Sequence, residues 1–257
     1  MKKVLFLLVA FLTISSQLAY GWGREGHDAI AYIAECHLKK SARKTIEKYL
    51  GNRSIVYYAS WMDDYRHTPE YKHSTVWHMA AVDADNNYTD AVKSPKGDVI
   101  SAIEESIETL KNYKQLDDST VCVHLKFLIH MVGDMHCPAH VAYSNLEIWY
   151  NVNLDGKNVS YHSVWDTRLI TSCHRWHYTE WQHQLDRCSK KEFSQMVTGT
   201  PRDWFHENAV ESRYIYDVAP SGSKLGRDFL NTNIKHAEKQ ILRAGYRLAH
   251  VLNELFG

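Results

Sequence analysis

Beyond its N-terminal residues, the sequence has no long hydrophobic run and no excess charge of either sign. No later stretch approaches the ~18 apolar residues of a membrane-spanning helix, which argues against an integral membrane protein. Basic and acidic residues number 30 each, so no broadly basic surface is available to hold a polyanion. Any attraction to a polyanion must therefore come from a local site. Repeats, low-complexity segments and inter-domain linkers are also lacking, which favours one domain.

The N-terminus has the pattern of a secretory signal peptide. Two lysines, an apolar run over residues 4–14 and the small-residue pattern Ala19-Tyr20-Gly21 follow one another. A short membrane anchor is the alternative, but the run is too short to span a bilayer comfortably. We therefore predict that residues 1–21 are cleaved before Trp22 and that residues 22–257 form one secreted or periplasmic domain with no membrane anchor.

Cysteine is scarce, and no pair has the C-x-x-C spacing of many metal sites. The five cysteines are Cys36, Cys122, Cys137, Cys173 and Cys188. In an exported protein they could form two disulfides and leave one odd thiol. We predict a disulfide between Cys173 and Cys188, because they flank a Trp/His-rich segment and close a short loop. Metal ligation by cysteine is the other interpretation.

Apolar residues at helical spacing predict an all-α, single-domain, multi-helix protein. Examples are Ile100, Ile103, Ile107 and Leu110; Val121, Leu125, Leu128 and Val132; and Ile234, Ile241, Leu248 and Leu252. One stretch alternates instead, from Ile148 through Val152 to Tyr161, with a turn at Asp155-Gly156. It predicts one small β-hairpin.

Histidine is abundant, with 16 residues, and two segments place a histidine four residues before an aspartate. The first pair is His130 and Asp134, and the second is His162 and Asp166. On a helix, residues four apart share one face and can converge on one cation. A surface or helix-cap hydrogen bond would give the same spacing, so one pair alone is weak evidence.

Both pairs are embedded in apolar or aromatic residues, such as Leu128 and Trp165. Burying carboxylates and imidazoles in such surroundings is costly unless a cation compensates them. Imidazole and carboxylate ligands suit Zn²⁺ better than Ca²⁺ or Mg²⁺, which favour shells of oxygen alone. The residues alone therefore predict a zinc site with ligands among His130, Asp134, His140, His162 and Asp166.

The role of His136 stays open. It precedes His140 by four residues and could compete as a ligand, but Pro138 interrupts the helix that would align them. The remaining histidines are expected to be surface residues or hydrogen-bonded partners. They are His37, His67, His73, His124, His174, His177, His183, His206, His236 and His250.

Further motifs accompany the two His/Asp segments. They are Trp22-Gly-Arg-Glu-Gly-His27, the run Ala59–Arg66, His78, and Gly245–Ala249. In this order they resemble the S1/P1 nuclease family of zinc-dependent single-strand nucleases, whose fold is shared by bacterial zinc phospholipase C. The resemblance extends from Trp22 to about Leu252 and implies an all-α zinc phosphodiesterase with one small hairpin.

The resemblance also implies three zinc ions per chain. Asp63, His78, His130 and Asp134 would surround the first ion, and His140, His162 and Asp166 the second. Trp22 would bind the third through its α-amino nitrogen and carbonyl oxygen, with His27 and the shared Asp134. A free α-amine has a pKa near 7.7 to 8, so zinc can displace its proton at modest cost.

The activity implied is hydrolysis of single-stranded DNA and RNA to products with 5′-phosphates, with 3′-nucleotides as further substrates. Asp63 and Asp134 would be catalytic ligands, and Arg66 would pair with the charge on the phosphoryl oxygens. An exposed salt bridge is the alternative for Arg66. Met79 could lie against a base, but the family's base-binding aspartate is displaced to Asp83, so base preference is not inherited. No stable protein partner is expected.

Two other functions compete with the nuclease. A zinc phospholipase C would cut a phosphodiester in lipid, but that branch carries Glu where this chain has Asp166. A non-catalytic zinc-binding or storage protein would lack an open position for water on the metal cluster. The aspartate favours the nuclease.

Overall fold

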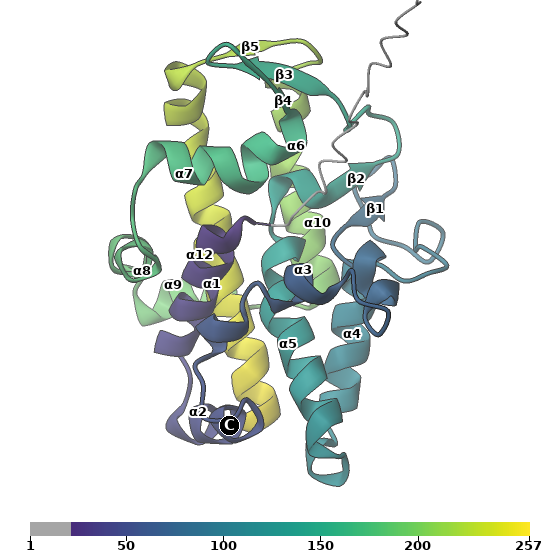
Figure 1. Cartoon of the computed structure of the whole chain (residues 1–257), viewed down its shortest axis with the longest axis vertical. Coiled ribbons are helices and arrows are strands. Elements are labelled where there is room, and N and C mark those ends of the chain that lie inside the picture. Colours follow the sequence, from purple (N-terminus) through teal and green to yellow (C-terminus); the bar gives the residue numbers. More distant parts are fainter. Residues whose placement is uncertain (1–21) are drawn as a thin grey trace, which may run out of the picture.

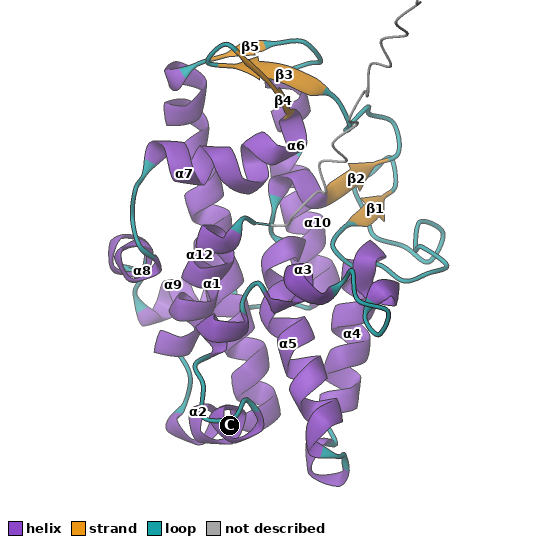
Figure 2. Cartoon of the chain, in the orientation of Figure 1, coloured by secondary structure: helices purple, strands orange, loops and turns teal. Residues whose placement is uncertain are grey.

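The computed structural model describes residues 22–257, and the predicted signal peptide lies outside them. Helices make up most of this part of the chain, with two small sheets (Figure 2). The α-helices are α1 (Arg24–Cys36), α2 (Lys40–Tyr49), α3 (Trp61–Tyr65), α4 (Val99–Leu110), α5 (Asp118–Met135), α6 (Tyr161–Ser163), α7 (Leu169–Cys173), α8 (Tyr178–Leu185), α9 (Lys190–Met196), α10 (Pro201–Ser212), α11 (Ile215–Val218) and α12 (Arg227–Phe256). The 3₁₀ segments are Ile55–Tyr58, Lys72–Val76, Tyr113–Gln115 and Pro138–His140, and Val164–Arg168 is a π-helix. The predicted helical single-domain architecture is confirmed.

Helix α12 runs along most of the length of the molecule and packs against α1 (Figure 1). The two helices approach closely at Gly245, where an added Cβ would lie 2.5 Å from Cγ2 of Ile33. Only a residue without a side chain allows this contact. No helix within residues 22–257 is both long and apolar enough to cross a membrane.

Helix α5 is central and packs against α4, α12 and α3. It begins after Asp117, whose side chain accepts a hydrogen bond from the backbone N–H of Thr120. Its C-terminal half is buried on all sides, and it ends at Met135, shortly before Pro138. The polar residues in this half therefore lie inside the protein.

The predicted hairpin is confirmed as β3 (Asn151–Leu154) and β4 (Lys157–Ser160), which pair antiparallel. Its turn residues Asp155 and Gly156 have φ angles of 48° and 83°, as a two-residue hairpin loop requires. The prediction missed β5 (Lys224–Leu225), which pairs parallel with β3.

A second small sheet was also not predicted from the sequence. It consists of β1 (Ala80–Val82) and β2 (Val141–Tyr143), which pair parallel with Ala80 opposite Val141. These strands begin shortly after His78 and His140, respectively. The pairing therefore brings two segments that carry candidate ligands side by side.

The predicted disulfide between Cys173 and Cys188 is wrong, because all five cysteines are free thiols. The thiol of Cys188 interacts with the hydroxyl of Tyr246. Cys173 lies instead near Arg227 and Glu238. Since Glu238 precedes Tyr246 by about 12 Å along α12, the two thiols face different parts of this helix. A disulfide requires Cα atoms less than about 7 Å apart.

Candidate metal centre

Helix α5 presents His130 and Asp134 on one buried face, as their spacing predicts. His130 Nε2 lies 3.1 Å from Asp134 Oδ2. The other ring nitrogen, Nδ1, donates a hydrogen bond of 2.8 Å to the backbone carbonyl of Ala59. This bond fixes the orientation of the ring and leaves Nε2 free to act as a ligand.

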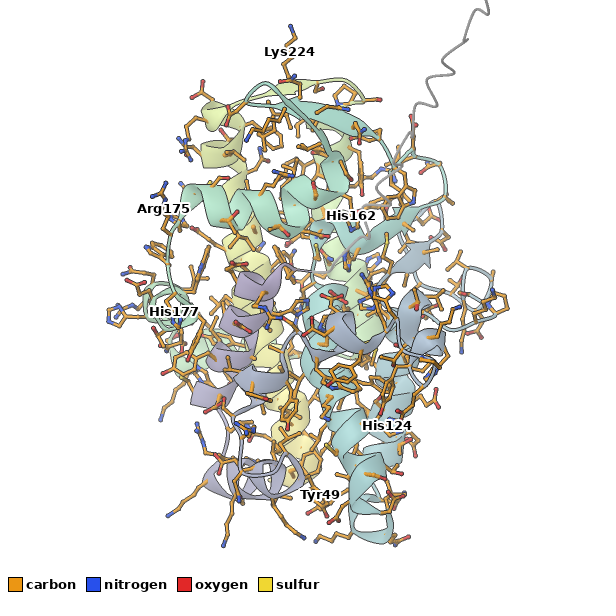
Figure 3. All side chains as sticks on the ribbon, viewed as in Figure 1. Tyr49, His124, His162, Arg175, His177 and Lys224 are labelled. Carbon is orange, nitrogen blue, oxygen red and sulfur yellow. The ribbon has the colours of Figure 1, made fainter. Side chains whose placement is uncertain are left out.

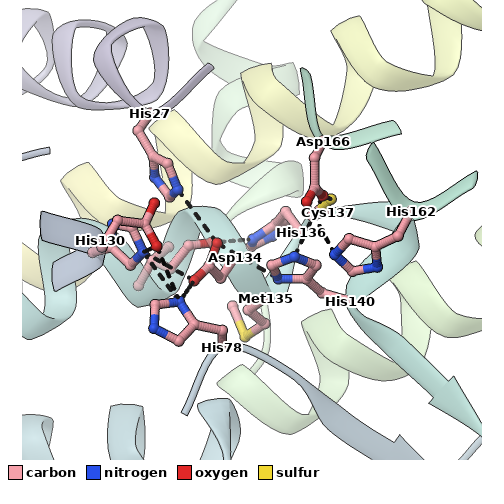
Figure 4. A network of polar contacts seen from close by, with 12 residues as sticks. His27, His78, His130, Asp134, Met135, His136, Cys137, His140, His162 and Asp166 are labelled. Carbon is pink, nitrogen blue, oxygen red and sulfur yellow. Dashed lines mark hydrogen bonds and ion pairs between the residues drawn. The ribbon is translucent and has the colours of Figure 1, made fainter. Parts of the chain in front are cut away.

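Three further side chains from other parts of the chain complete a first group around this pair, and Figure 4 labels two of them, His27 and His78. His78 follows the segment Lys72–Val76, and its Nδ1 lies 2.7 Å from Asp134 Oδ2. Asp63 of α3 places Oδ1 3.8 Å from both His78 Nδ1 and His130 Nε2. His27 of α1 stacks on His130, with ring centroids 4.0 Å apart.

Gly133 makes the approach of His27 to α5 possible. A Cβ at this position would lie 2.9 Å from His27 Nδ1, closer than real contacts allow. The glycine next to Asp134 therefore opens a gap for the imidazole. As a result, His27 Nε2 lies 3.3 Å from Asp134 Oδ1.

A second buried group lies beside the first and contains His140, His162 and Asp166 (Figure 4). His162 Nε2 is 3.0 Å from Asp166 Oδ2, and His140 Nε2 is 3.4 Å from Asp166 Oδ1. Asp166 lies in the π-helix Val164–Arg168, a form that occurs often at functional sites. Both pairs predicted from their spacing are thus confirmed as buried neighbours.

Asp134 joins the two groups, because its two oxygens face different histidines. Oδ2 faces His78 and His130, whereas Oδ1 faces His27 and His140, whose Nδ1 is 3.5 Å away. The carboxylate is fully buried. One carboxylate could therefore serve two cations.

Trp22, the first described residue, is fully buried beside this centre. The backbone N–H of Gly23 donates a hydrogen bond of 2.7 Å to the carbonyl of Asp166. Gly26 lets the Trp22 side chain pack over α1, since an added Cβ there would lie 2.9 Å from Trp22 Cβ. The backbone of Trp22 is thereby held next to the segment that carries Asp166.

The donor atoms fit a cation better than they fit one another. Many of them are buried without a hydrogen-bond partner, although polar atoms in protein interiors are normally paired. These atoms are Nδ1 and Nε2 of His27, Oδ1 of Asp63, Nε2 of His78, Oδ1 of Asp134, Nδ1 and Nε2 of His140, and Nε2 of His162. Two ligands at ~2.1 Å from one tetrahedral zinc lie ~3.4 Å apart. Five of the separations within and between the two groups, 3.3 to 3.8 Å, are of this size, whereas three ion pairs are shorter, at 2.7 to 3.1 Å.

The structure answers the question of His136. Its Nδ1 donates to the carbonyl of Val132, and its Nε2 accepts from Arg247 Nη1 at 2.9 Å. Both ring nitrogens are therefore occupied, and burial together with Arg247 holds the pKa of His136 well below its usual value. His136 is a neutral hydrogen-bonding residue that connects α5 to α12.

Cys137 was not singled out by sequence reasoning, which kept metal ligation by the cysteines only as a general alternative to disulfides. The thiol is fully buried and lies 3.1 Å from Asp166 Oδ1, so it adds a possible donor atom to the second group beside His140 and Asp166. Burial and the neighbouring carboxylate raise the pKa of the thiol well above its usual value. The available signal was its position between Asp134 and His140.

The remaining predicted residues border the first group. Arg66 is buried rather than exposed, and its Nη1 lies 3.6 Å from Asp63 Oδ1. Met79 is half-buried directly after His78. The carboxylate of Asp83 accepts hydrogen bonds from the backbone N–H groups of Asp85 and Asn87, so it stabilises its own turn.

Some of the histidines expected to play no direct role can be placed away from the two groups. Figure 3 shows His124 and His177 near the periphery of the molecule, well separated from His162. His124 contacts Ser106, and His37 pairs with Asp186. Neither contact involves a residue of the two groups.

A family model, S1/P1 Nuclease, matches residues 22–257, which is nearly the whole chain. The chain belongs to the S1/P1 nuclease family. Membership in this family makes the protein a hydrolase of the nuclease class. The buried His/Asp groups fit a multinuclear metal site.

Individual S1/P1 relatives cover different shares of the chain. Nuclease P1 of Penicillium citrinum is 27% identical over 267 residues, which cover 92% of this chain and 98% of that protein. Endonuclease 3 of Arabidopsis thaliana is 24% identical over 282 residues, which cover 96% of this chain and 94% of that protein. Nuclease S1 of Aspergillus oryzae is 31% identical over 180 residues, or 66% of this chain and 61% of that protein.

The proximity of histidines and carboxylates in the two groups of this S1/P1 nuclease shifts their pKa values toward charged pairs when no cation is bound. Burial acts to lower the pKa of His130, but Asp134 and Asp63 outweigh it and raise the pKa to about 9. Burial also acts to lower the pKa of His140, but Asp134 and Asp166 outweigh it, and the pKa is raised. Although burial acts to raise it, the pKa of Asp134 is well below its usual value because of His130 and His140.

These shifts predict how the stability of the metal-free protein depends on pH. A histidine whose pKa is raised on folding stabilises the protein below its unfolded value of about 6.5, and this contribution is lost as pH rises through the folded value. The pKa values of His27 and His78 are lowered on folding, so these residues change the stability only below about pH 6.5. They therefore do not affect its change between pH 7 and pH 9. The free energy of unfolding should therefore fall between pH 7 and pH 9 after chelation.

Urea denaturation at pH 7, 8 and 9, with and without a chelator, measures this effect. The metal-loaded protein should be more stable throughout and should lose less stability over this range than the metal-free protein, because a metal replaces the proton on His130. Metal-free stability that stays constant or rises from pH 7 to pH 9 would contradict the proton assignment.

Proposed function

We propose that this S1/P1 nuclease is a zinc-dependent endonuclease that hydrolyses single-stranded DNA and RNA to products with 5′-phosphates. We also propose that it removes the phosphate from 3′-nucleotides. The observation that supports this most directly is the position of Asp134, whose two oxygens face two different sets of histidines. The similarity to nuclease S1, nuclease P1 and endonuclease 3 adds to this support.

The ligands we propose form three zinc sites. The first site has Asp63, His78, His130 and Asp134; the second has His140, His162 and Asp166; and the third has Trp22, His27 and Asp134. Unpartnered nitrogen and oxygen atoms support the assignment for six of these residues, which are His27, Asp63, His78, Asp134, His140 and His162. When bound, zinc would supply Lewis-acid chemistry, which activates water and stabilises negative charge on phosphoryl oxygens.

The three carboxylates determine the charge of the site. Asp63, Asp134 and Asp166 bring three negative charges, which neutralise only part of the charge of three divalent ions. A positive pocket remains for an anionic phosphodiester. This local charge explains how a chain with 30 basic and 30 acidic residues could attract nucleic acid.

Arg66 and Met79 are proposed to contact the substrate. The guanidinium of Arg66 is held beside Asp63, where it can donate hydrogen bonds to phosphoryl oxygens as negative charge builds on them. Met79 offers a half-buried apolar surface next to His78. Since the Asp83 carboxylate is engaged in its own turn, Met79 would hold a base without selecting its identity.

The location of the protein is part of the proposal. We infer that residues 1–21 direct export and are removed before Trp22, so that the enzyme is secreted or periplasmic. Within residues 22–257, the structure has no helix that could cross a membrane. Sequencing the N-terminus of the exported protein would test this inference.

Single strands should be cut faster than duplexes, and lipid hardly at all. The candidate ligands are at least nine-tenths buried, so a phosphodiester can reach them only where the bases around it are unstacked. The acidic ligand Asp166 also matches the nuclease branch rather than the phospholipase branch. Rates on single-stranded DNA, RNA, duplex DNA and phosphatidylcholine micelles should be measured on one sample, with zinc analysis.

A chelator-treated aliquot of the same sample is the control, and it should be inactive on every substrate. Equal rates on phosphatidylcholine and on single-stranded DNA would favour a phospholipase instead. Full activity with fewer than about two zinc ions per chain would rule out the trinuclear arrangement.

A further inference from the structure

Trp149 is an exposed tryptophan that lies directly on the candidate metal centre. Its side chain is 54% exposed, and its ring stacks on His162 with centroids 4.8 Å apart and an interplanar angle of 26°. His162 stacks in turn on His140, with centroids 5.0 Å apart and an angle of 19°. The three rings form a column that begins at the buried His140 and ends at the surface with Trp149.

The connection between β2 and β3 holds Trp149 in this position. The residue before it, Ile148, is largely buried. The residue after it, Tyr150, stacks on Tyr161 with centroids 5.1 Å apart and donates a hydrogen bond of 2.7 Å to the carbonyl of Ala219. Trp149 and Tyr150 therefore stack on two successive residues of α6, and the neighbours of Trp149 in the chain fix its position.

One face of the indole remains available for a ligand. His162 covers the opposite face, so the exposed surface of Trp149 is its outer face and its edges. Exposed aromatic rings beside a site for phosphate are typical of proteins that bind single-stranded nucleic acid, because every base has a π face that can stack on them. A base on Trp149 would extend the ring column outward.

We propose that Trp149 is a stacking platform for a nucleobase next to the phosphate held at the metal centre. This inference rests on the proposed function and extends it with a subsite that accepts any base. Since a base, its sugar and its phosphate are covalently joined, stacking on Trp149 would orient the phosphate toward His162. Trp149 would thus contribute to substrate binding rather than to chemistry.

The test compares zinc-loaded wild type with Trp149→Ala, Trp149→Phe and Tyr57→Ala. Tyr57 is a matched control, because its ring is 62% exposed but its ring contacts are with Tyr58 and Arg53. On oligothymidylate, Trp149→Ala should raise KM about tenfold with little change in kcat. Trp149→Phe should recover most of the loss, and Tyr57→Ala should match wild type.

Substrates and ligands without bases isolate the stacking contribution. On an oligonucleotide of the same length with abasic sites, wild type and Trp149→Ala should have the same KM. Calorimetry should likewise show that Trp149→Ala weakens binding of thymidine 5′-phosphate but leaves binding of deoxyribose 5-phosphate unchanged. This measurement needs no turnover.

Several outcomes would overturn the subsite. Trp149→Ala with a normal KM but lost zinc would show that Trp149 only supports His162, and an equal effect of Tyr57→Ala would show that no particular ring is required. Failure of wild type to cut any oligonucleotide would overturn the proposed function instead. In that case calorimetry still decides whether Trp149 binds a base.

Discussion

Replacing Asp134 by Asn is expected to lower turnover on single-stranded DNA by at least about a hundredfold. Loss of a residue that only orients a metal ligand typically costs 10- to about 100-fold, and Asp134 is a candidate ligand itself. Its Oδ2 lies 2.7 Å from His78 Nδ1 and its Oδ1 lies 3.3 Å from His27 Nε2. An amide keeps one oxygen but replaces the other with NH₂, which cannot bind a cation and carries no charge.

Metal analysis and kinetics on the same preparation measure this effect, and zinc content should fall together with turnover. Asp98→Asn is a matched control, because Asp98 is also a buried carboxylate but serves as the N-cap of α4. Asn is as good an N-cap as Asp and keeps one oxygen for Ser101, so this variant should lose the hydrogen bond from Ser94 and some stability but remain active. Near-normal turnover in Asp134→Asn would show that the carboxylate does not bridge two metals.

The sequence predicted those parts of the site that depend on local geometry. His130 and Asp134 share one turn of α5, and His162 and Asp166 share the turn that includes the π-helix, so a spacing of four residues was enough. The hairpin was equally local, because the preference of Asp155-Gly156 for positive φ determines its turn.

The other residues of the site depend on tertiary packing, which spacing does not reveal. Asp63, His78 and His27 belong to three separate parts of the chain, and no periodicity relates them to α5. They were found only through the resemblance to the S1/P1 nuclease family. The approach of His27 further depends on the missing side chain of Gly133, a condition that a single sequence does not show.

His136 and Cys137 show that closeness in sequence to the predicted ligands is not enough to predict the role of a side chain. They adjoin the same motif, yet His136 turns its ring toward Val132 and Arg247, while the thiol of Cys137 reaches Asp166. The helix ends at Met135 and Pro138 follows, so residues 136–140 do not continue the direction of the helix. Helical spacing therefore could not predict which side chains of this segment face the metal centre.

An extension of Gly-Ser before Trp22 is expected to remove the third zinc and most of the activity. Trp22 is fully buried, and the hydrogen bond from Gly23 to Asp166 together with the packing of Trp22 on Gly26 holds its backbone beside the centre. A free α-amine can bind zinc at modest cost because its pKa is near 7.7 to 8. The amide nitrogen of a continuous chain donates one N–H and has no lone pair for a metal.

The first and second sites use side chains only, so the extended protein should fold and bind about two of the three zinc ions. Adding the same Gly-Ser after Gly257, which is exposed at the end of α12, is the matched control and should preserve all three zinc ions and full turnover. Zinc content, melting temperature and rates on single-stranded DNA distinguish the two variants. Full activity with the N-terminal extension would remove Trp22 from the site, and would imply that His27 and Asp134 hold the third cation without the α-amine.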